Sequence, residues 1–265
     1  MSDIPVVIVT GASRGVGASV ARWLGKVGAS VTLMARSSDP LKRVAQDVKR
    51  LGGLALTIPG DVADKNACRR TVEKTINRFG PVDAIVNNAG TVQPIASVAS
   101  GDEDAWHYNI EVNLLGPFHM TKAAIPHLRK QKGRIINVCS GAANIPVQAA
   151  SAYCASKAAL VHFTRVLAEE EPSLTAISMR PGVVDTEMQA LIRREGVKAM
   201  PPEQVAYYQN LKSEGELELP FVPARSIAWL SLHAPRHWSG DFLNYDDPQI
   251  MGPSIAVFGE HLEEL

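Results

Sequence analysis

Three residues suited to proton transfer lie within one stretch of the chain, Asn137–Lys157. Ser140 closes an apolar run that predicts a buried strand, whereas Tyr153 and Lys157 lie in a predicted helix. The tyrosine and the lysine are four residues apart, about one helical turn, so their side chains share one face of that helix. A cation at about 4 Å favours a phenolate by up to ~4 kcal/mol at intermediate dielectric, or about three pKa units. The spacing therefore predicts a tyrosine whose pKa is low enough for general acid or base catalysis.

Taken alone, a tyrosine and a lysine at this spacing are better explained by a helix with a packed phenol and an exposed ammonium than by a catalytic pair. The elements that position the two residues decide between these interpretations. Apolar, β-branched runs of strand length alternate along the chain with segments of helical periodicity. The predicted strands are residues 4–10, 29–35, 54–62, 82–90, 134–140, 174–182 and 240–245. The predicted helices are residues 15–28, 38–51, 64–79, 102–112, 115–130, 149–171 and 224–233. This alternation predicts an α/β fold in which residues 1–265 form one doubly wound domain, with helices on both faces of a parallel sheet.

Residues 185–221 break the alternation. They contain Pro201-Pro202 and mix charges with large apolar side chains such as Met188. A connection this long inside a compact domain is usually a lid or a disordered loop. Because the segment follows the carboxyl end of a strand, we predict an irregular lid that selects the substrate. The tail, residues 251–265, shows no pattern that assigns it a role.

The composition argues against several classes of protein. Hydrophobic residues make up 46% of the 265 residues and the formal net charge is +0, so neither disorder nor a surface for nucleic acid or anionic membrane is indicated. No apolar run reaches transmembrane length and the N-terminus lacks a basic leader, so a cytoplasmic protein is expected. The 3 cysteines show no CxxC spacing, which indicates reduced thiols, and the 7 histidines lack ligand spacing, so no metal is expected.

A glycine-rich turn directly follows the first predicted strand and opens the first helix. It comprises Gly11, Ser13, Arg14, Gly15, Val16 and Gly17, in the order GxxxGxG. Glycines there allow the backbone to approach a phosphate, and the helix N-terminus favours its negative charge. A glycine-rich turn is a weak signal alone, but in this position it predicts a dinucleotide site.

The end of the second strand indicates which dinucleotide is bound. An acidic residue there would accept a ribose 2′-hydroxyl, as in NAD sites, but this chain has Arg36 followed by Ser37. An arginine fork suits a 2′-phosphate, and Arg14 can reach the same group. Asp39 comes later and fits a helix cap better. We therefore predict NADP(H) as the cofactor.

Two further strand ends carry residues that fit a cofactor. Asp61 and Val62 end the third strand, where a carboxylate can accept from an adenine amino group, although an ordinary turn aspartate is equally consistent. Asn88, Ala89 and Gly90 end the fourth strand, where small residues would let a cofactor cross the edge of the sheet. This turn can also be purely structural.

The ordered set of motifs resembles the short-chain dehydrogenase/reductase family over nearly the whole chain. The matching segments are TGASRGVG, DV, NNAG, EVNLLG, Ser140, YCASK and PGVVDT. The resemblance implies a single Rossmann domain with a seven-stranded parallel sheet. It also implies homodimers or homotetramers that pair through residues 115–130 and 149–171.

Carried over by position, the resemblance implies a catalytic set of Asn113, Ser140, Tyr153 and Lys157. Tyr153 would protonate the substrate oxygen and Ser140 would polarise the carbonyl. Lys157 would hold the nicotinamide ribose and lower the pKa of the tyrosine, and Asn113 would hold a water that links Lys157 to solvent. An asparagine making a local hydrogen bond at a helix end is the alternative for Asn113.

The same resemblance assigns further contacts. Cofactor contacts fall on Pro181, Gly182, Val184 and Thr186, with Tyr153 and Lys157 at the nicotinamide ribose and Asp61, Val62 and Asn88 on the adenosine side. The substrate would contact Ser140, Ala142, Val147, Tyr153 and Met188, with Ile145 beside them.

The expected activity is that of an NADPH-dependent carbonyl reductase acting on a ketone or 1,2-diketone. LAEEEPS, PGVVDTEMQ and FLNYDDP resemble benzil reductases and sepiapterin-reductase-like members of the family. A sepiapterin-type or 3-oxoacyl reductase, an alcohol dehydrogenase, and a regulator that senses NADP(H) without chemistry are the alternatives. Asp246 or Asp247 could anchor a pterin, but a solvated turn is the favoured explanation.

Overall fold

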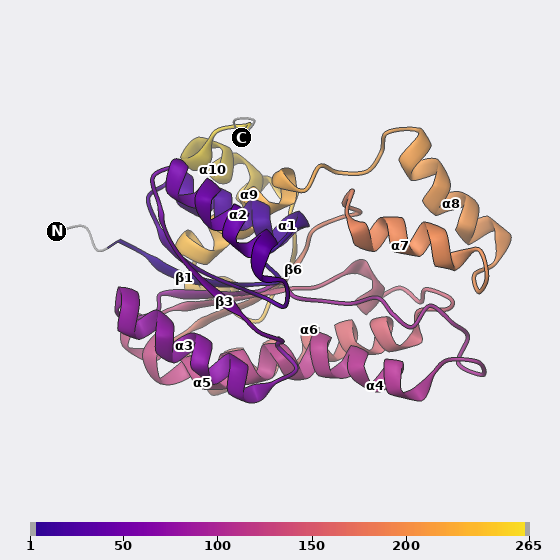
Figure 1. Cartoon of the computed structure of the whole chain (residues 1–265), viewed down its shortest axis with the longest axis horizontal. Helices are drawn as coiled ribbons and strands as arrows, with labels where there is room; N and C mark the ends of the chain where they lie inside the picture. The colour runs from indigo at the N-terminus through magenta and orange to yellow at the C-terminus, as the bar shows by residue number, and fades with distance from the viewer. Residues whose placement is uncertain (1–3, 263–265) are drawn as a thin grey trace.

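The computed structural model describes residues 4–262, so the ends of the predicted 1–265 domain and of the 251–265 tail lie outside the described residues. Seven strands form one all-parallel sheet in the order β3-β2-β1-β4-β5-β6-β7 (Figure 1). The strands are β1 Val6–Thr10, β2 Ser30–Ala35, β3 Leu54–Pro59, β4 Ala84–Asn87, β5 Arg134–Val138, β6 Thr175–Arg180 and β7 Phe242–Asn244. The order reverses direction between β1 and β4, which is where a doubly wound sheet binds its ligands.

Helices cover both faces of the sheet. On one face lie α1 Gly15–Lys26, α2 Ser38–Arg50, α9 Phe221–His233 and α10 Pro248–Phe258 (Figure 1). On the other face lie α3 Lys65–Phe79, α5 Gly116–Gln131 and α6 Ser151–Glu170. Each layer buries its own apolar cluster against the sheet, around Trp23 and Leu24 on the first face and around Met120 and Leu128 on the second. This arrangement confirms the predicted α/β fold.

Burial on both faces explains why the strands could be recognised. All five residues of β1 are buried, so the run VVIVT carries no polar alternation. Thr10 of β1 pairs in register with Met34 of β2, and Val9 pairs with Val86 of β4. The carboxyl ends of these strands therefore meet at one edge, where the loops that follow them come together.

The predicted lid segment is helical, so the expectation of an irregular segment is wrong. Residues 185–221 contain two helices, α7 Glu187–Gly196 and α8 Pro202–Ser213. Both helices stand beyond the carboxyl ends of the strands, at one end of the molecule (Figure 1). Pro201 and Pro202 do not interrupt them, because they occupy the N-cap and the first position of α8, where proline needs no hydrogen-bond donor.

Other helices also differ from the prediction. Helix α4 Glu103–Ile110 runs into a π-helical turn, Glu111–Leu115, and then into α5 without the predicted break. Helix α2 has Ser37 at its N-cap, whereas Asp39 lies in the first turn and pairs with Lys42 at 3.0 Å. In the tail, α10 begins after Asp247, whose carboxylate accepts a hydrogen bond from the Gln249 N–H at 2.9 Å. Asp39 is therefore not a cap, and Asp247 is one.

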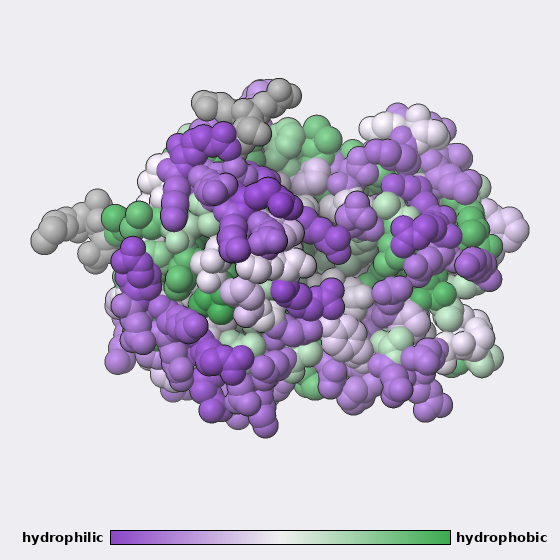
Figure 2. Space-filling model, in the orientation of Figure 1, coloured by the Kyte–Doolittle hydropathy of each residue, from purple (hydrophilic) through white to green (hydrophobic). Residues whose placement is uncertain are grey.

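None of the helices among residues 4–262 is long and apolar enough to cross a membrane. The hydrophilic surface is interrupted at the end of the molecule that carries α7 and α8, where Figure 2 shows apolar side chains exposed. Val197, Tyr207 and Leu219 of this segment are each more than half exposed.

Candidate active site

The glycine-rich turn is built by close backbone contact with the β4 loop. A Cβ on Gly11 would lie 2.8 Å from Ala89 Cα, and a Cβ on Gly17 would lie 2.5 Å from the Gly11 carbonyl oxygen. Gly11 also has φ +64°, a conformation that side chains disfavour. The Asn88 amide donates to the Thr10 and Gly11 carbonyls at 3.0 and 3.3 Å. Asn88 therefore holds the turn in place, which is the structural role that the sequence left open.

The N-terminus of α1 has the properties of an anion site. Arg14 occupies its N-cap position with no capping side chain, and the first turn contains no acidic residue. Gly15 has φ +56°, and its missing side chain leaves room beside Thr186. The Arg14 side chain is exposed and makes no hydrogen bond or ion pair in the part of the chain that the structure describes. These features fit the diphosphate of a dinucleotide.

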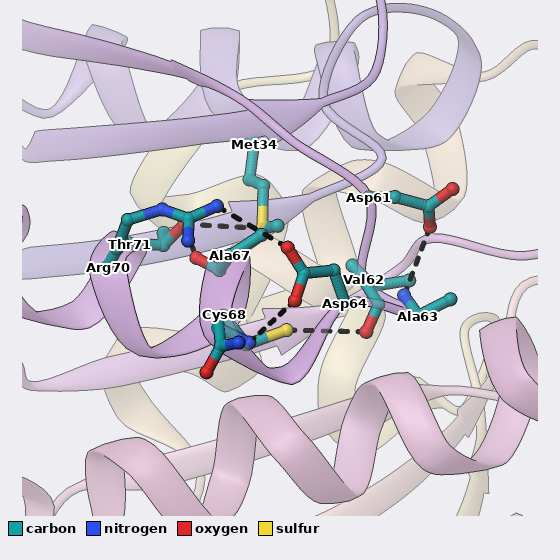
Figure 3. Close-up of polar contacts among 10 residues, drawn as sticks. Met34, Asp61, Val62, Ala63, Asp64, Ala67, Cys68, Arg70 and Thr71 are labelled. Atoms are coloured by element: carbon teal, nitrogen blue, oxygen red, sulfur yellow. Dashed lines mark hydrogen bonds and ion pairs between the residues drawn. The ribbon is translucent and has the colours of Figure 1, made fainter.

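The adenosine end of such a dinucleotide would meet Arg36, Ser37 and Asp61. Arg36 and Ser37 are exposed, and the Ser37 hydroxyl caps no backbone group. Arg36 Nη1 donates to Tyr108 Oη at 3.0 Å, and that hydroxyl donates to Asp61 Oδ2 at 2.7 Å. Asp61 Oδ1 accepts from the Ala63 N–H at 3.0 Å, and the carboxylate points away from the Asp64 cluster (Figure 3).

The loop behind Asp61 is held by its own hydrogen bonds. Asp64 caps α3 by accepting from the Asn66 N–H at 2.8 Å and pairs with Arg70 at 3.4 Å. The Cys68 thiol donates to the Val62 carbonyl at 3.4 Å (Figure 3). Val62 therefore lies in a fixed turn, and its side chain packs closely against Gly116.

Tyr153 and Lys157 both lie on α6, as predicted. Lys157 is 4% exposed, and its ammonium donates to the Val138 carbonyl at 2.8 Å and lies 5.8 Å from the centroid of the Tyr153 ring. Burial raises the pKa of Tyr153 to about 12, and the hydrogen bond with Ser140 opposes this rise only in part. Burial also lowers the pKa of Lys157. The predicted lowering of the tyrosine pKa is therefore wrong for the chain without cofactor, because desolvation outweighs the effect of Ser140, which lowers the pKa.

Ser140 lies two residues after the end of β5, where the chain turns into the short 3₁₀ helix Gly141–Ala143. Its hydroxyl accepts from the Ala142 N–H at 3.2 Å and lies near enough to Tyr153 to lower the pKa of the phenol in part. Because β5 and α6 carry the two hydroxyls, the sheet and the helix together fix their approach. A carbonyl oxygen placed between the two hydroxyls could accept a hydrogen bond from each.

Asn113 is fully buried in the π-helical turn. Its side-chain oxygen accepts from the Thr91 N–H at 2.9 Å. Its amide nitrogen donates to the Thr91 carbonyl, Asn109 Oδ1 and Ser156 Oγ at 2.8, 2.8 and 3.1 Å. These contacts use both amide hydrogens, so a water-holding role would fall to the main-chain carbonyl of Asn113.

Residues 181–186 cross the end of the sheet beside the glycine turn. The Glu218 N–H donates to the Val183 carbonyl and the Asp185 N–H donates to the Glu218 carbonyl, at 2.9 and 2.8 Å. This pairing turns the main chain of Val184 to the opposite side. Thr186 Cγ2 faces Gly15, and Gly182, with φ +76°, packs on the Tyr245 ring. Pro181, Gly182, Val184 and Thr186 thus follow one edge of the candidate site.

The lid places an apolar cluster over Tyr153. The cluster consists of Val92, Ile95, Ala149, Tyr153, Met188, Leu191, Ile192, Met200, Val205 and Tyr208. Met188, a predicted substrate contact, therefore lies in the same apolar cluster as Tyr153. Ala142 and Val147 lie partly buried in the β5–α6 connection, whereas Ile145 is 59% exposed and does not join the cluster.

Several residues of the site escaped prediction. Asn109 and Ser156 form the buried network around Asn113, with Ser156 Oγ donating to Asn109 Oδ1 at 3.0 Å. Ser156 precedes Lys157 directly, so its polarity inside an apolar helix was a usable signal. Tyr208 carried no such signal, because its place depends on a lid whose helices were not predicted. The described residues contain no group of three or more histidine, cysteine or acidic side chains that could hold a metal.

Known proteins share this architecture. The profile of the family described as short chain dehydrogenase matches residues 5–196. A solved short chain dehydrogenase/reductase from Saccharomyces cerevisiae is 34% identical, with a TM-score of 0.89 over 94% of this chain and 98% of that chain. A benzil reductase, (S)-benzoin forming, from the same yeast is 31% identical over 94% of this chain and 98% of its own length. The solved complex of a metagenomic blue fluorescent protein with NADPH is 30% identical, with a TM-score of 0.78 over 91% of this chain and 95% of that chain.

Proposed function

The chain belongs to the short-chain dehydrogenase family, and on that premise we propose that this oxidoreductase reduces ketones or 1,2-diketones with NADPH. The observation that carries the proposal is the placement of Ser140 next to Tyr153, with the Lys157 ammonium 5.8 Å from the centroid of the Tyr153 ring. With its pKa raised to about 12, the Tyr153 phenol is protonated at neutral pH. A protonated phenol is the form that can donate a proton to a carbonyl oxygen, as reduction requires.

Each side chain then has a distinct task. NADPH, when bound, supplies the hydride. Ser140 donates a hydrogen bond to the carbonyl oxygen, where negative charge develops. Tyr153 gives its proton to the same oxygen, which becomes the hydroxyl of the product. Lys157 holds the ribose and favours the phenolate that remains, and Asn113 fixes the helix behind it.

Arg36, Ser37 and Arg14 support the choice of NADPH over NADH. The Arg36 guanidinium has four N–H groups beyond the one that reaches Tyr108. The Ser37 hydroxyl and the Arg14 guanidinium are exposed near the same loops and have no partner of their own among residues 4–262. A dianionic 2′-phosphate suits this donor set better than a ribose hydroxyl does. The NADPH complex of the metagenomic relative agrees with this choice.

The apolar cluster over Tyr153 supports an aromatic or branched substrate. Met188, Leu191 and Tyr208 come from the lid and face the phenol that would donate the proton. Such a lining stabilises a diketone with large apolar groups better than a small charged carbonyl compound. The similarity to a benzil reductase agrees with that substrate class.

The loss of NADPH absorbance with benzil, and with a panel of other ketones, tests the proposal. The wild-type chain should oxidise NADPH faster than NADH, at equal concentration, when benzil is present. Tyr153→Phe should lower kcat by at least about 10²-fold, the contribution of one general acid, while NADPH affinity measured by fluorescence stays the same. Turnover by Tyr153→Phe at the wild-type rate would contradict the assigned proton donor. Absence of turnover with every ketone would contradict the reductase assignment.

A further inference from the structure

Three residues that are distant in sequence meet at one hydroxyl group on the adenosine side of the candidate site. Arg36 follows β2, Asp61 follows β3, and Tyr108 lies on α4. Tyr108 Oη accepts from Arg36 Nη1 at 3.0 Å and donates to Asp61 Oδ2 at 2.7 Å. The phenol thus bridges the residue expected to bind the 2′-phosphate and the residue expected to bind the adenine.

The direction of the two hydrogen bonds is fixed by the chemistry of the three groups. A guanidinium can only donate and a carboxylate can only accept, so the single phenolic proton goes to Asp61 and an oxygen lone pair faces Arg36. Burial, and then the hydrogen bond to Asp61, raise the pKa of Tyr108, although Arg36 opposes the rise. The hydroxyl therefore keeps the proton that it donates to Asp61 at neutral pH.

Tyr108 is the fixed member of the bridge and Arg36 is the adaptable one. The Tyr108 ring packs against the apolar cluster under α3 and α5. Its neighbour Asn109 ties α4 to the β4 loop by donating to the Thr91 and Gln93 carbonyls at 3.1 and 2.6 Å. Arg36, in contrast, is exposed, and within the described residues its one polar contact is with Tyr108.

We infer that Tyr108 is a positioning residue for the 2′-phosphate, because it holds the Arg36 guanidinium in place through one hydrogen bond and leaves the remaining N–H groups free for the ligand. The inference rests on the proposed NADPH site. A long, exposed arginine loses many rotamers when it binds a phosphate, so an arginine that is already ordered binds it more tightly. The hydroxyl acts through Arg36 and does not itself need to touch the phosphate.

Binding of two fragments by isothermal titration calorimetry tests the inference without catalysis. The fragment 2′,5′-ADP carries the 2′-phosphate, whereas 5′-AMP lacks it. Tyr108→Phe keeps the packed ring and removes the hydroxyl, so it should weaken 2′,5′-ADP about 5-fold, the value of one net hydrogen bond, and should leave 5′-AMP within about 2-fold. In an Arg36→Met background, Tyr108→Phe should have no further effect on 2′,5′-ADP. Tyr207→Phe, which removes an exposed phenol on α8, is the matched control and should bind both fragments as the wild type does.

Three outcomes would overturn the inference. Equal weakening of both fragments would give Tyr108 a general structural role. Further weakening in the Arg36→Met background would show that the hydroxyl does not act through the arginine. Tighter binding of 2′,5′-ADP by Tyr108→Phe would show that the hydrogen bond to Tyr108 hinders the binding of the phosphate by Arg36. Failure of the wild type to bind 2′,5′-ADP, or equal affinity of the wild type for both fragments, would instead refute the NADPH site on which the inference rests.

Discussion

The protonation state of Tyr153 is set mainly by burial, which Ser140 opposes in part. The Lys157 ammonium lies 5.8 Å from the ring centroid and donates a hydrogen bond to the Val138 carbonyl. Burial dominates and raises the Tyr153 pKa to about 12. A neutral phenol favours reduction, and the reverse reaction needs an additional positive charge near the ring. The positively charged nicotinamide ring of an oxidised cofactor would supply such a charge.

We expect the phenolate form of Tyr153 to be absent at neutral pH in the cofactor-free protein. Its pKa is raised above that of a free tyrosine, so the phenol should ionise only as the pH rises past ~10. The contribution of Tyr153 to the free energy of unfolding depends on pH in the same direction. It is fully present below ~10, the pKa of tyrosine in the unfolded chain, and is lost as the pH rises toward the pKa in the folded chain. The near-ultraviolet phenolate band, taken as the difference between the wild type and Tyr153→Phe, measures the ionisation.

Oxidised cofactor should move this titration to lower pH, because a cation near the ring favours the phenolate. Reduced cofactor, which lacks that charge, serves as the control and should shift it less. A phenolate band for Tyr153 already present at neutral pH without cofactor would contradict the burial argument. Residue types and spacing predicted that Ser140, Tyr153 and Lys157 would meet. They could not reveal the proton affinity, since that depends on how much water each group loses.

At the scale of elements, the lid is an ordered pair of helices fastened at several points. Lys212 at the end of α8 pairs with Asp185, just before α7, at 2.6 Å. Gln204 donates to the Gln148 carbonyl at 3.1 Å, and Gln93 donates to Glu195 at 3.2 Å. These contacts hold the apolar face of the lid on Tyr153, so we propose that the lid contributes to substrate binding.

Lys212→Met should raise the KM for a ketone substrate about 2–5-fold and change kcat little. This factor corresponds to the free energy of one partly exposed ion pair. The reason is that loss of the pair loosens the closed lid without touching Ser140, Tyr153 or Lys157. Steady-state kinetics at low salt measure the effect, which should shrink at high salt as screening weakens the pair. Lys198→Met, an exposed lysine after α7, is the control. A fall in kcat with unchanged KM would show that the pair does not act through the lid.

The elements also show where prediction from the sequence stops. Continuous apolar runs predicted the five inner strands, because burial on both faces leaves no other pattern. The edge strands β3 and β7 were predicted as well, although they are only partly buried. Helices α7 and α8 escaped, since Pro201-Pro202 resembles a break although it lies at a helix start. Helix α10 contains Gly252 and Pro253, which argue against a helix when read alone. The π-helical turn around Asn113 inserts a residue into a helix, and no residue type marks such an insertion.

At the scale of the whole molecule, a chain of buried polar groups ties the sheet to α6. Asn87 donates to Asn137, Asn137 donates to Thr164, and Ser178 donates to the same threonine, at 2.8, 2.8 and 2.9 Å. These residues come from β4, β5, β6 and α6, and each is at most 3% exposed. Because α6 also carries Tyr153 and Lys157, the network fixes the helix of the active site against the centre of the fold.

Thr164→Val should therefore lower the free energy of unfolding by roughly 2–4 kcal/mol, because it leaves the buried Asn137 amide and Ser178 hydroxyl without a partner. Urea unfolding followed by circular dichroism measures this loss. Thr57→Val is the matched control, because Thr57 lies on the edge strand β3 and its hydroxyl makes no hydrogen bond within residues 4–262. A loss for Thr164→Val no larger than that for Thr57→Val would contradict the importance of the network.

An apolar face on α5 and α6 supports the predicted homo-oligomer. Leu115, Phe118 and Val166 are 37%, 38% and 42% exposed, and Phe118 stacks edge-on against Phe163 with ring centroids 6.2 Å apart. Phe118→Glu should lower the mass in solution to that of one chain, as measured by light scattering after size exclusion. Val98→Glu, at an isolated apolar residue that is 84% exposed, should leave the mass unchanged. A wild-type chain that is already monomeric would contradict the prediction.

The chain leaves the body of the molecule at Val184 and returns at Glu218, and main-chain hydrogen bonds join these two points. The Tyr245 hydroxyl, next to β7, donates to the Glu218 carboxylate at 2.6 Å and anchors the returning strand. The helices between Val184 and Glu218 therefore form one contiguous segment whose two ends are fixed side by side. The entropy of closing a loop between fixed ends changes only slowly with its length, so segments of other lengths and other side chains can replace this one. A scaffold of this kind can diversify its substrates by exchanging one contiguous segment while the sheet and the glycine turn stay unchanged.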